Sequence, residues 1–127
     1  MNVPENLLYT KTHEWVSFDN GAARVGLTEY AAESMGDIVY FNLPAVGGAI
    51  TAGSALCEVE SVKAVSEIIS PVSGEISAVN SELETAPGSV NASPYETWVV
   101  EIKNIAAKAD MLTPAQYAAF CEAEAGS

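Results

Sequence analysis

Positive charge is scarce in this 127-residue sequence. Five Lys and Arg residues stand against 17 Asp and Glu, which gives a formal net charge of −12. Nucleic acids and anionic membranes are bound mainly through Lys and Arg, so this charge argues against either partner. No apolar run approaches the roughly 20 residues that cross a bilayer. Hydrophobic residues nevertheless make up 49% of the chain, and we expect one folded domain over residues 1–127.

Residues that build metal sites and nucleophilic catalytic sites are equally rare. His13 is the only histidine, and Cys57 and Cys121 lie far apart in the sequence. Zinc needs clustered ligands and a cysteine nucleophile needs a histidine base, so the sequence predicts neither a metal site nor a self-contained enzyme. It also lacks a glycine-rich phosphate loop and a Gly-x-Ser-x-Gly elbow. The cysteine spacing leaves a disulfide open, but a reducing cytoplasm favours two buried thiols.

The first six residues carry no positive region followed by an apolar stretch, and no Arg-rich amphipathic segment. A secretory signal or an organelle presequence would show one or the other. We therefore expect a bacterial cytoplasmic protein. A mature protein of the mitochondrial matrix would have the same features.

Short strands separated by turns dominate the first 103 residues. The expected strands span residues 14–18, 22–27, 38–43, 55–62, 64–69, 75–79 and 98–103. Thr28 and Gly36 delimit a short helix over residues 29–35, and residues 81–86 favour one or two helical turns. A capping-box sequence with Pro at the first helical position starts a C-terminal helix at about 113–124. The pattern predicts a mainly β fold, either a small barrel or a sandwich.

Alternation within these segments predicts which side chains share a face. In residues 55–62, one face carries Ala55, Cys57, Val59 and Ser61. The other face carries Leu56, Glu58 and Glu60. The bulky aromatic side chains are expected in the core: Trp15, Tyr40, Phe41 and Trp98. One face of the last strand is expected inside: Trp98, Val100 and Ile102. In the C-terminal helix, Tyr117, Phe120 and Cys121 are expected to share one face.

Lys63 interrupts two alternating segments, residues 58–62 and 64–69. If these segments pair as a hairpin over about 55–70, Lys63 lies at its tip with a flexible side chain in solvent. The turn itself is a weak signal, because no Asn-Gly or Asp-Gly pair is present. On these grounds alone, a lysine that merely solvates a loop is the commoner explanation.

The surrounding motif resembles the lipoyl- and biotinyl-carrier arrangement. It comprises Glu60-Ser61-Val62-Lys63-Ala64, preceded by Gly47 and Gly53 and followed by Pro71-Val72-Ser73-Gly74. The Glu-Ser-Val-Lys-Ala version is similar to the glycine cleavage H-protein family in particular. Further segments follow in that family's order, at residues 9–16, 25–31, 35–39, 43–44 and 90–98. The resemblance implies a flattened β-barrel or sandwich (a barrel-sandwich hybrid) with short helices, a C-terminal helix and a modified Lys63 on a protruding hairpin.

The same resemblance implies a function. Lipoate would be joined to Lys63 by a lipoate ligase or lipoyltransferase, and the chain would be a carrier and not an enzyme. It would shuttle the aminomethyl group of glycine from a pyridoxal-phosphate glycine decarboxylase to a folate-dependent aminomethyltransferase. A dihydrolipoamide dehydrogenase would then reoxidise the arm.

In this family a cleft shelters the loaded arm, and four residues are candidates for it here: Thr12, Glu14, Ser34 and Glu67. Glu14 and Glu67 would attract a charged amine, although both are also compatible with ordinary surface charges. Ser34 stands where some members of the family carry His. The segment from Tyr95 to Trp98 is shorter than is usual in the family and lacks its glycines. His13 is expected to be structural.

Two alternatives remain from the sequence. One is a lipoyl relay protein, in which the same Lys63 supplies lipoate to other complexes. The other is an unmodified β-domain that binds proteins. Modification of Lys63 separates the second alternative from both carrier functions.

Overall fold

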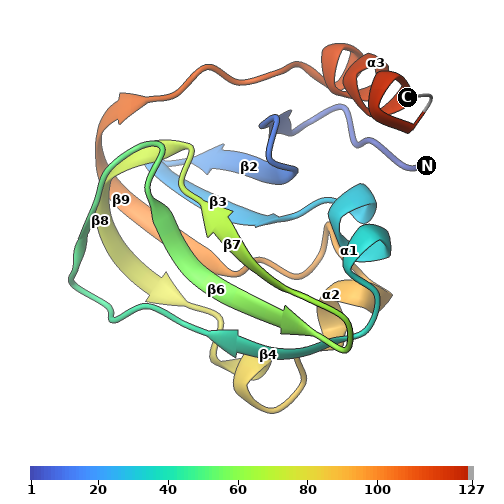
Figure 1. Ribbon diagram of the computed structural model, residues 1–127. Coiled ribbons are helices and arrows are strands. Elements are labelled where there is room, and N and C mark those ends of the chain that lie inside the picture. The colour runs from blue at the N-terminus through green and yellow to red at the C-terminus, as the bar shows by residue number, and fades with distance from the viewer. Residues whose placement is uncertain (126–127) are drawn as a thin grey trace.

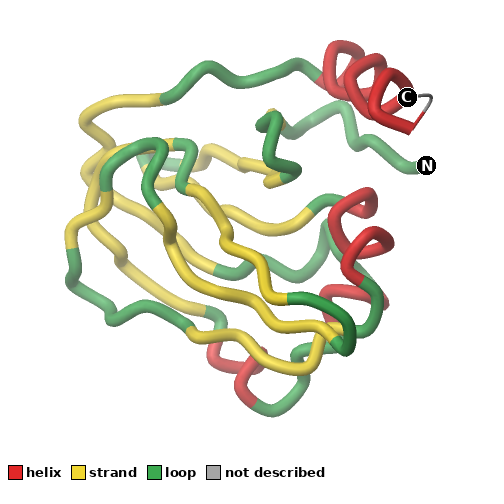
Figure 2. The backbone as a smooth tube through the Cα atoms, in the orientation of Figure 1, coloured by secondary structure: helices red, strands yellow, loops and turns green. Residues whose placement is uncertain are grey.

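Two antiparallel sheets form the framework of the computed structural model, which describes residues 1–125 (Figures 1 and 2). The six-stranded sheet has the order β1-β2-β3-β9-β8-β5, and the three-stranded sheet has the order β4-β6-β7. The strands of the two sheets are β1 (Leu8–Tyr9), β2 (Glu14–Asp19), β3 (Ala22–Leu27), β4 (Ile38–Asn42), β5 (Ala49–Ile50), β6 (Ala55–Ser61), β7 (Val65–Ile69), β8 (Val72–Val79) and β9 (Val100–Lys108). The fold is mainly β as predicted, and among the described residues the sheets form an open sandwich instead of a closed barrel.

The core lies between the two sheets because alternate side chains of both point inward. Fully buried members come from both layers: Val16, Val25, Val59, Ile68, Val72 and Ile102. Cys57 belongs to this cluster as a free thiol, and burial raises its pKa to about 12. The predicted thiol state of Cys57 and Cys121 is confirmed, since both are buried and free.

Helix α3 (Pro114–Ala125) covers a second, smaller cluster beside the N-terminal segment (Figure 1). Tyr9 and Tyr117 stack there with ring centroids 4.6 Å apart, and Cys121 is buried next to them. The connection to α3 is fixed by two backbone hydrogen bonds between Tyr9 and Leu112, of 2.9 and 2.6 Å. The predicted C-terminal helix therefore holds the start of the chain against the sandwich.

The early helix, α1 (Glu29–Met35), has the predicted ends. The Thr28 hydroxyl accepts a hydrogen bond from the Ala31 N–H at 3.2 Å, and Gly36 closes the helix with a φ of 75°. Two shorter helical segments, η1 (Ser81–Glu84) and α2 (Ser89–Ala92), follow β8. The last strand starts at Val100 and runs to Lys108, so it is shifted and longer than predicted.

Two core predictions are wrong, those for Tyr40 and Trp98, and irregular strand geometry explains the first. Register shifts in the β4–β6 and β6–β7 pairings, between Ile38 and Tyr40 and between Ala55 and Cys57, break the strict alternation of side chains. Tyr40 is consequently 51% exposed, whereas Leu56 is only 5% exposed. Trp98 precedes β9 and is only partly buried, with the Arg24 guanidinium 4.8 Å above its ring.

Gly26 is required for the packing of Trp15 against β3. A Cβ atom at Gly26 would lie 2.4 Å from Cε2 of Trp15, a distance that forces the indole to move. We expect Gly26→Ala to lower the free energy of unfolding by about 1–3 kcal/mol, measured by urea denaturation and Trp fluorescence. Gly88→Ala is the control, because that site is open and its φ of −66° suits alanine. A Gly26→Ala protein as stable as the control would contradict this assignment.

Candidate functional site

Lys63 lies at the tip of the β6–β7 hairpin, as the predicted pairing requires. Glu60 faces Val65 in the last register pair, and the Ser61 N–H donates to the Ala64 carbonyl at 2.8 Å. The Ser61 hydroxyl oxygen also accepts hydrogen bonds from the N–H groups of Lys63 and Ala64, at 3.3 and 3.1 Å. Val62 and Lys63 keep negative φ angles. The serine therefore stabilises the turn without the Asn-Gly pair that is usual in tight hairpins.

The tip is also attached to the segment that links α1 to β4. The Val62 N–H donates to the Asp37 carbonyl at 3.0 Å. The Lys63 side chain passes over Gly36, where an added Cβ would lie 3.5 Å from its Cε. Lys63 is exposed, so its amine is accessible while the stem of the side chain follows the end of α1.

A cleft of about 140 Å³ opens next to this path, between α1, β7 and the turn before β2. Its lining residues are Thr12, His13, Leu27, Ala31, Ser34, Met35, Val59, Ser66 and Glu67. Met35 lies in this wall and directly precedes Gly36, which places the cleft within reach along the lysine stem. The wall is apolar on the core side and polar at its rim.

The structure brings three of the four predicted cleft residues together: Thr12, Ser34 and Glu67. Met35, Ser66 and Gly36 were not singled out from the sequence. The sequence indicates Gly36 only as the end of a helix, and Ser66 only as one position in an alternating strand. Their proximity depends on how the hairpin packs against α1, for which the local sequence carries no signal.

Glu14 does not line the cleft, and the interpretation of this residue as a surface charge is wrong. Its side chain is fully buried. Its carboxylate accepts hydrogen bonds from the hydroxyls of Thr10 and Thr12 and from the Ile69 N–H at 3.2 Å. Burial raises the pKa of Glu14 above its ordinary value, and these hydrogen bonds limit the rise.

Thr12 links the buried carboxylate to the cleft. Its hydroxyl proton is committed to Glu14, which leaves the lone pairs of the same oxygen as acceptors. Because Thr12 also lines the cleft, an N–H donor there would find this oxygen oriented to receive it. Glu14 thus acts on the cleft through Thr12.

His13 forms the opposite wall, and its contacts with neighbouring side chains fit the structural role predicted for it. Its φ is 70°, and its ring stacks on Tyr30 at 4.4 Å. Nδ1 lies 2.7 Å from the Tyr117 hydroxyl, and Nε2 lies 2.9 Å from Oε2 of Glu124. The carboxylate accepts from Nε2–H, so in the neutral ring Nδ1 accepts from Tyr117. The histidine therefore couples α3 to the cleft.

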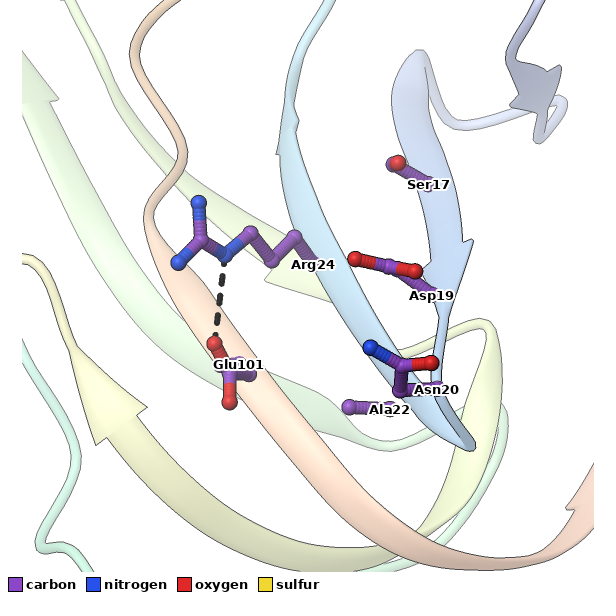
Figure 3. A pocket seen from close by; sticks show the side chains of 6 residues that line it. All are labelled: Ser17, Asp19, Asn20, Ala22, Arg24 and Glu101. Atoms are coloured by element: carbon purple, nitrogen blue, oxygen red, sulfur yellow. Dashed lines mark hydrogen bonds and ion pairs between the residues drawn. The ribbon is translucent and has the colours of Figure 1, made fainter.

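A larger groove of about 460 Å³ lies on the outer face of β2, β3 and β9 (Figure 3). Its central cation, Arg24, donates to Glu101 at 3.1 Å and is already neutralised by it. None of the hairpin residues borders this groove. Within residues 1–125, no three His, Cys, Asp or Glu side chains gather as a metal site. No helix in the same part of the chain is long and apolar enough to span a membrane.

Comparison with known proteins gives a consistent assignment. A family model described as "Glycine cleavage H-protein" matches residues 7–124. The "Glycine cleavage system H protein" of Lachnoclostridium phytofermentans is 47% identical over 125 residues, or 98% of each chain. The "Probable glycine cleavage system H protein" of Pyrococcus furiosus is 51% identical over 102 residues, 80% of this chain and 76% of that one. The crystal structure of a glycine cleavage system H protein from Mycobacterium marinum has a TM-score of 0.90 at 35% identity, covering 94% of this chain and 99% of that one.

Substitutions of Glu14 separate its hydrogen bonds from its charge. Glu14→Ala leaves the partly buried Ile69 N–H without its acceptor, and we expect the free energy of unfolding to fall by about 1–3 kcal/mol. Glu14→Gln keeps an acceptor for Ile69 and donors for the threonine oxygens, so it should fold with near wild-type stability at pH 7. The measurement is urea denaturation between pH 4 and pH 8.

The pH dependence has a defined sign. A carboxyl whose folded-state pKa is raised contributes stability that is complete below its ordinary value near 4.5 and is lost as pH rises through the folded-state pKa. Wild type should therefore gain stability relative to Glu14→Gln as pH falls from 8 toward 4.5. A difference that stays constant, or that grows with rising pH, would contradict the buried-carboxyl assignment.

Proposed function

The chain belongs to the glycine cleavage H-protein family, and from this premise we propose that it carries lipoate as an amide on Lys63. The observation that supports this site is the exposed lysine at the tip of the β6–β7 hairpin, inside the Glu-Ser-Val-Lys-Ala motif. When bound, the dithiolane supplies a sulfur that accepts the aminomethyl group from glycine decarboxylase, yields it to the aminomethyltransferase and is reoxidised by dihydrolipoamide dehydrogenase. The protein is thus a carrier subunit that visits three enzymes.

The residues around Lys63 suit a long acylated arm. The Ser61 turn and the Val62–Asp37 hydrogen bond hold the tip rigidly, while the lysine side chain itself stays in solvent. Gly36 leaves room for the lysine stem beside α1. Tethering of this kind raises the local concentration of the carried group at each enzyme.

The cleft next to α1 suits a load that ends in an amine. Leu27, Met35 and Val59 provide apolar walls that exclude water. At the rim, the Thr12 oxygen accepts N–H donors and the Glu67 carboxylate favours positive charge. Glu14 keeps the Thr12 hydroxyl oriented from behind the rim. We propose that these residues shelter the loaded arm and slow its hydrolysis.

Acylation at one lysine is the first test of this function. After incubation with lipoate, ATP and a lipoate ligase, intact mass should increase by one lipoyl group, and peptide mapping should place it on Lys63. Lys63→Arg should abolish the increase, whereas Lys11→Arg, also at an exposed lysine, should leave it unchanged. An unmodified, folded wild-type protein would favour the β-domain that only binds proteins.

Reconstitution then separates the shuttle from the lipoyl relay. The lipoylated chain should support glycine-dependent CO₂ release by glycine decarboxylase, and lipoylated Lys11→Arg should do so equally. A lipoylated chain that donates its lipoate to other complexes but leaves the decarboxylase inactive would establish the relay instead.

Sheltering of the arm predicts faster loss of its load when the cleft rim is altered. Thr12→Val removes the oriented acceptor with almost no change in shape, and Glu67→Gln removes the rim charge. We expect each to increase the rate at which the aminomethylated arm releases formaldehyde by about threefold to tenfold, equivalent to about 0.7–1.4 kcal/mol. Thr51→Val, an exposed site away from the cleft, is the control. Unchanged release rates in both variants would disprove sheltering by these side chains.

A further inference from the structure

Four of the large apolar side chains that this protein exposes lie around Lys63. They are Val39, Tyr40, Val62 and Val65, with exposures of 51%, 51%, 67% and 62%, and we call them the tip patch. Single exposed apolar residues need no explanation, but several at one end of one small sheet indicate a contact surface.

Strand pairing places these residues together. Tyr40 faces Glu60 across β4 and β6, and Glu60 faces Val65 across β6 and β7. Side chains of directly paired residues share one face of a sheet, so Tyr40 and Val65 stand on either side of Glu60. Figure 1 shows the three strands side by side, with the hairpin tip close to the start of β4. The shift between Ile38 and Tyr40 leaves Val39 and Tyr40 exposed in succession at this edge.

The surrounding charge is negative. Glu58, Glu60 and Glu67 share the outer face of the sheet by register, and none of them forms an ion pair among the described residues. Lys63 is the only cation on β4, β6, β7 or their connecting tip. The other four cations lie on the six-stranded sheet or next to it. A partner that fits this face therefore has an apolar recess with Lys or Arg at its rim.

The short reach of an unmodified lysine indicates which enzyme contacts the tip patch. An enzyme that acylates Nζ must bring an unextended lysine into its active site, so its surface comes within the length of one lysine side chain of the tip. Enzymes that act on the far end of an acylated arm are not held to this distance. The tip patch adjoins Lys63 on the hairpin and, through the Val62–Asp37 hydrogen bond, on the start of β4.

We propose that the tip patch, with Glu58 and Glu60 beside it, is the docking surface for the enzyme that acylates Lys63. Tyr40 and Val65 are its apolar anchors, and the carboxylates guide a basic rim into place. This inference rests on the proposed attachment of lipoate to Lys63. Acylation removes the lysine charge, which changes the surface that the enzyme has recognised and so favours release of the product.

The test measures kcat and KM for lipoylation of the chain by a lipoate ligase, with lipoate and ATP saturating. Tyr40→Thr and Val65→Thr keep β-forming residues at exposed positions and should leave folding intact. We expect each to raise KM for the chain about fivefold to tenfold with little change in kcat, as loss of an interface anchor does. Val46→Thr, at a 58% exposed valine outside the three-stranded sheet, is the matched control.

The contribution of the carboxylates is tested separately, by the dependence of kcat/KM on salt concentration. Wild-type kcat/KM should fall with added NaCl, and a Glu58→Gln, Glu60→Gln double variant should have a lower value with a flatter salt dependence. Glu84→Gln, an exposed carboxylate on η1, should match wild type. If wild type is never lipoylated, the proposed function fails. If wild type is lipoylated and the Tyr40 and Val65 variants match Val46→Thr, the function stands and the docking surface is disproved.

Discussion

The buried carboxylate of Glu14 is the constraint on which the functional end of the molecule depends. Glu14 lies on β2 of the large sheet. Its carboxylate accepts a hydrogen bond from the Ile69 N–H on β7, an edge strand of the small sheet. The hydroxyls of Thr10 and Thr12 complete its hydrogen bonds. Glu14 is fully buried and the Ile69 N–H is partly buried, so this hydrogen bond ties the edge of the small sheet to the large one. The cleft adjoins this junction through Thr12, which donates to Glu14 and also lines the cleft.

A second constraint acts from the other side of the cleft. Tyr117 on α3 joins the α1 cap to the cleft wall, because its hydroxyl lies 2.7 Å from both Thr28 Oγ1 and His13 Nδ1. Nε2 of His13 lies 2.9 Å from Oε2 of Glu124, so the chain of hydrogen bonds runs from the α1 cap through His13 to the end of α3. The C-terminal helix is thereby part of the site, although it contributes no lining residue to it.

Local sequence rules predicted the features whose causes are local. The ends of α1 follow from Thr28 and Gly36, and the position of Lys63 follows from two alternating segments that flank it. Non-local packing was beyond those rules. Glu14 looks like a surface charge in an alternating strand, and its burial depends on donors 4 and 55 residues away. Tyr40 looks like a core aromatic, and only the shifted register at an edge strand exposes it. Irregular strand pairing and hydrogen-bond donors far away in the chain produce no periodic pattern in the sequence.

The two faces of β7 contribute to two different surfaces of the hairpin, the proposed docking surface and the cleft. Val65 and Ser66 are adjacent and therefore point to opposite faces, Val65 to the outer face and Ser66 to the cleft. An enzyme docked on the outer face would leave the cleft open to the acylated arm. Once Lys63 is an amide, the outer face carries only negative charge, whereas the cleft offers apolar walls and an oriented acceptor. The same hairpin can thus be recognised before loading and be sheltered afterwards without any change in fold, because the two surfaces share a backbone but no side chains except Glu67 at the edge.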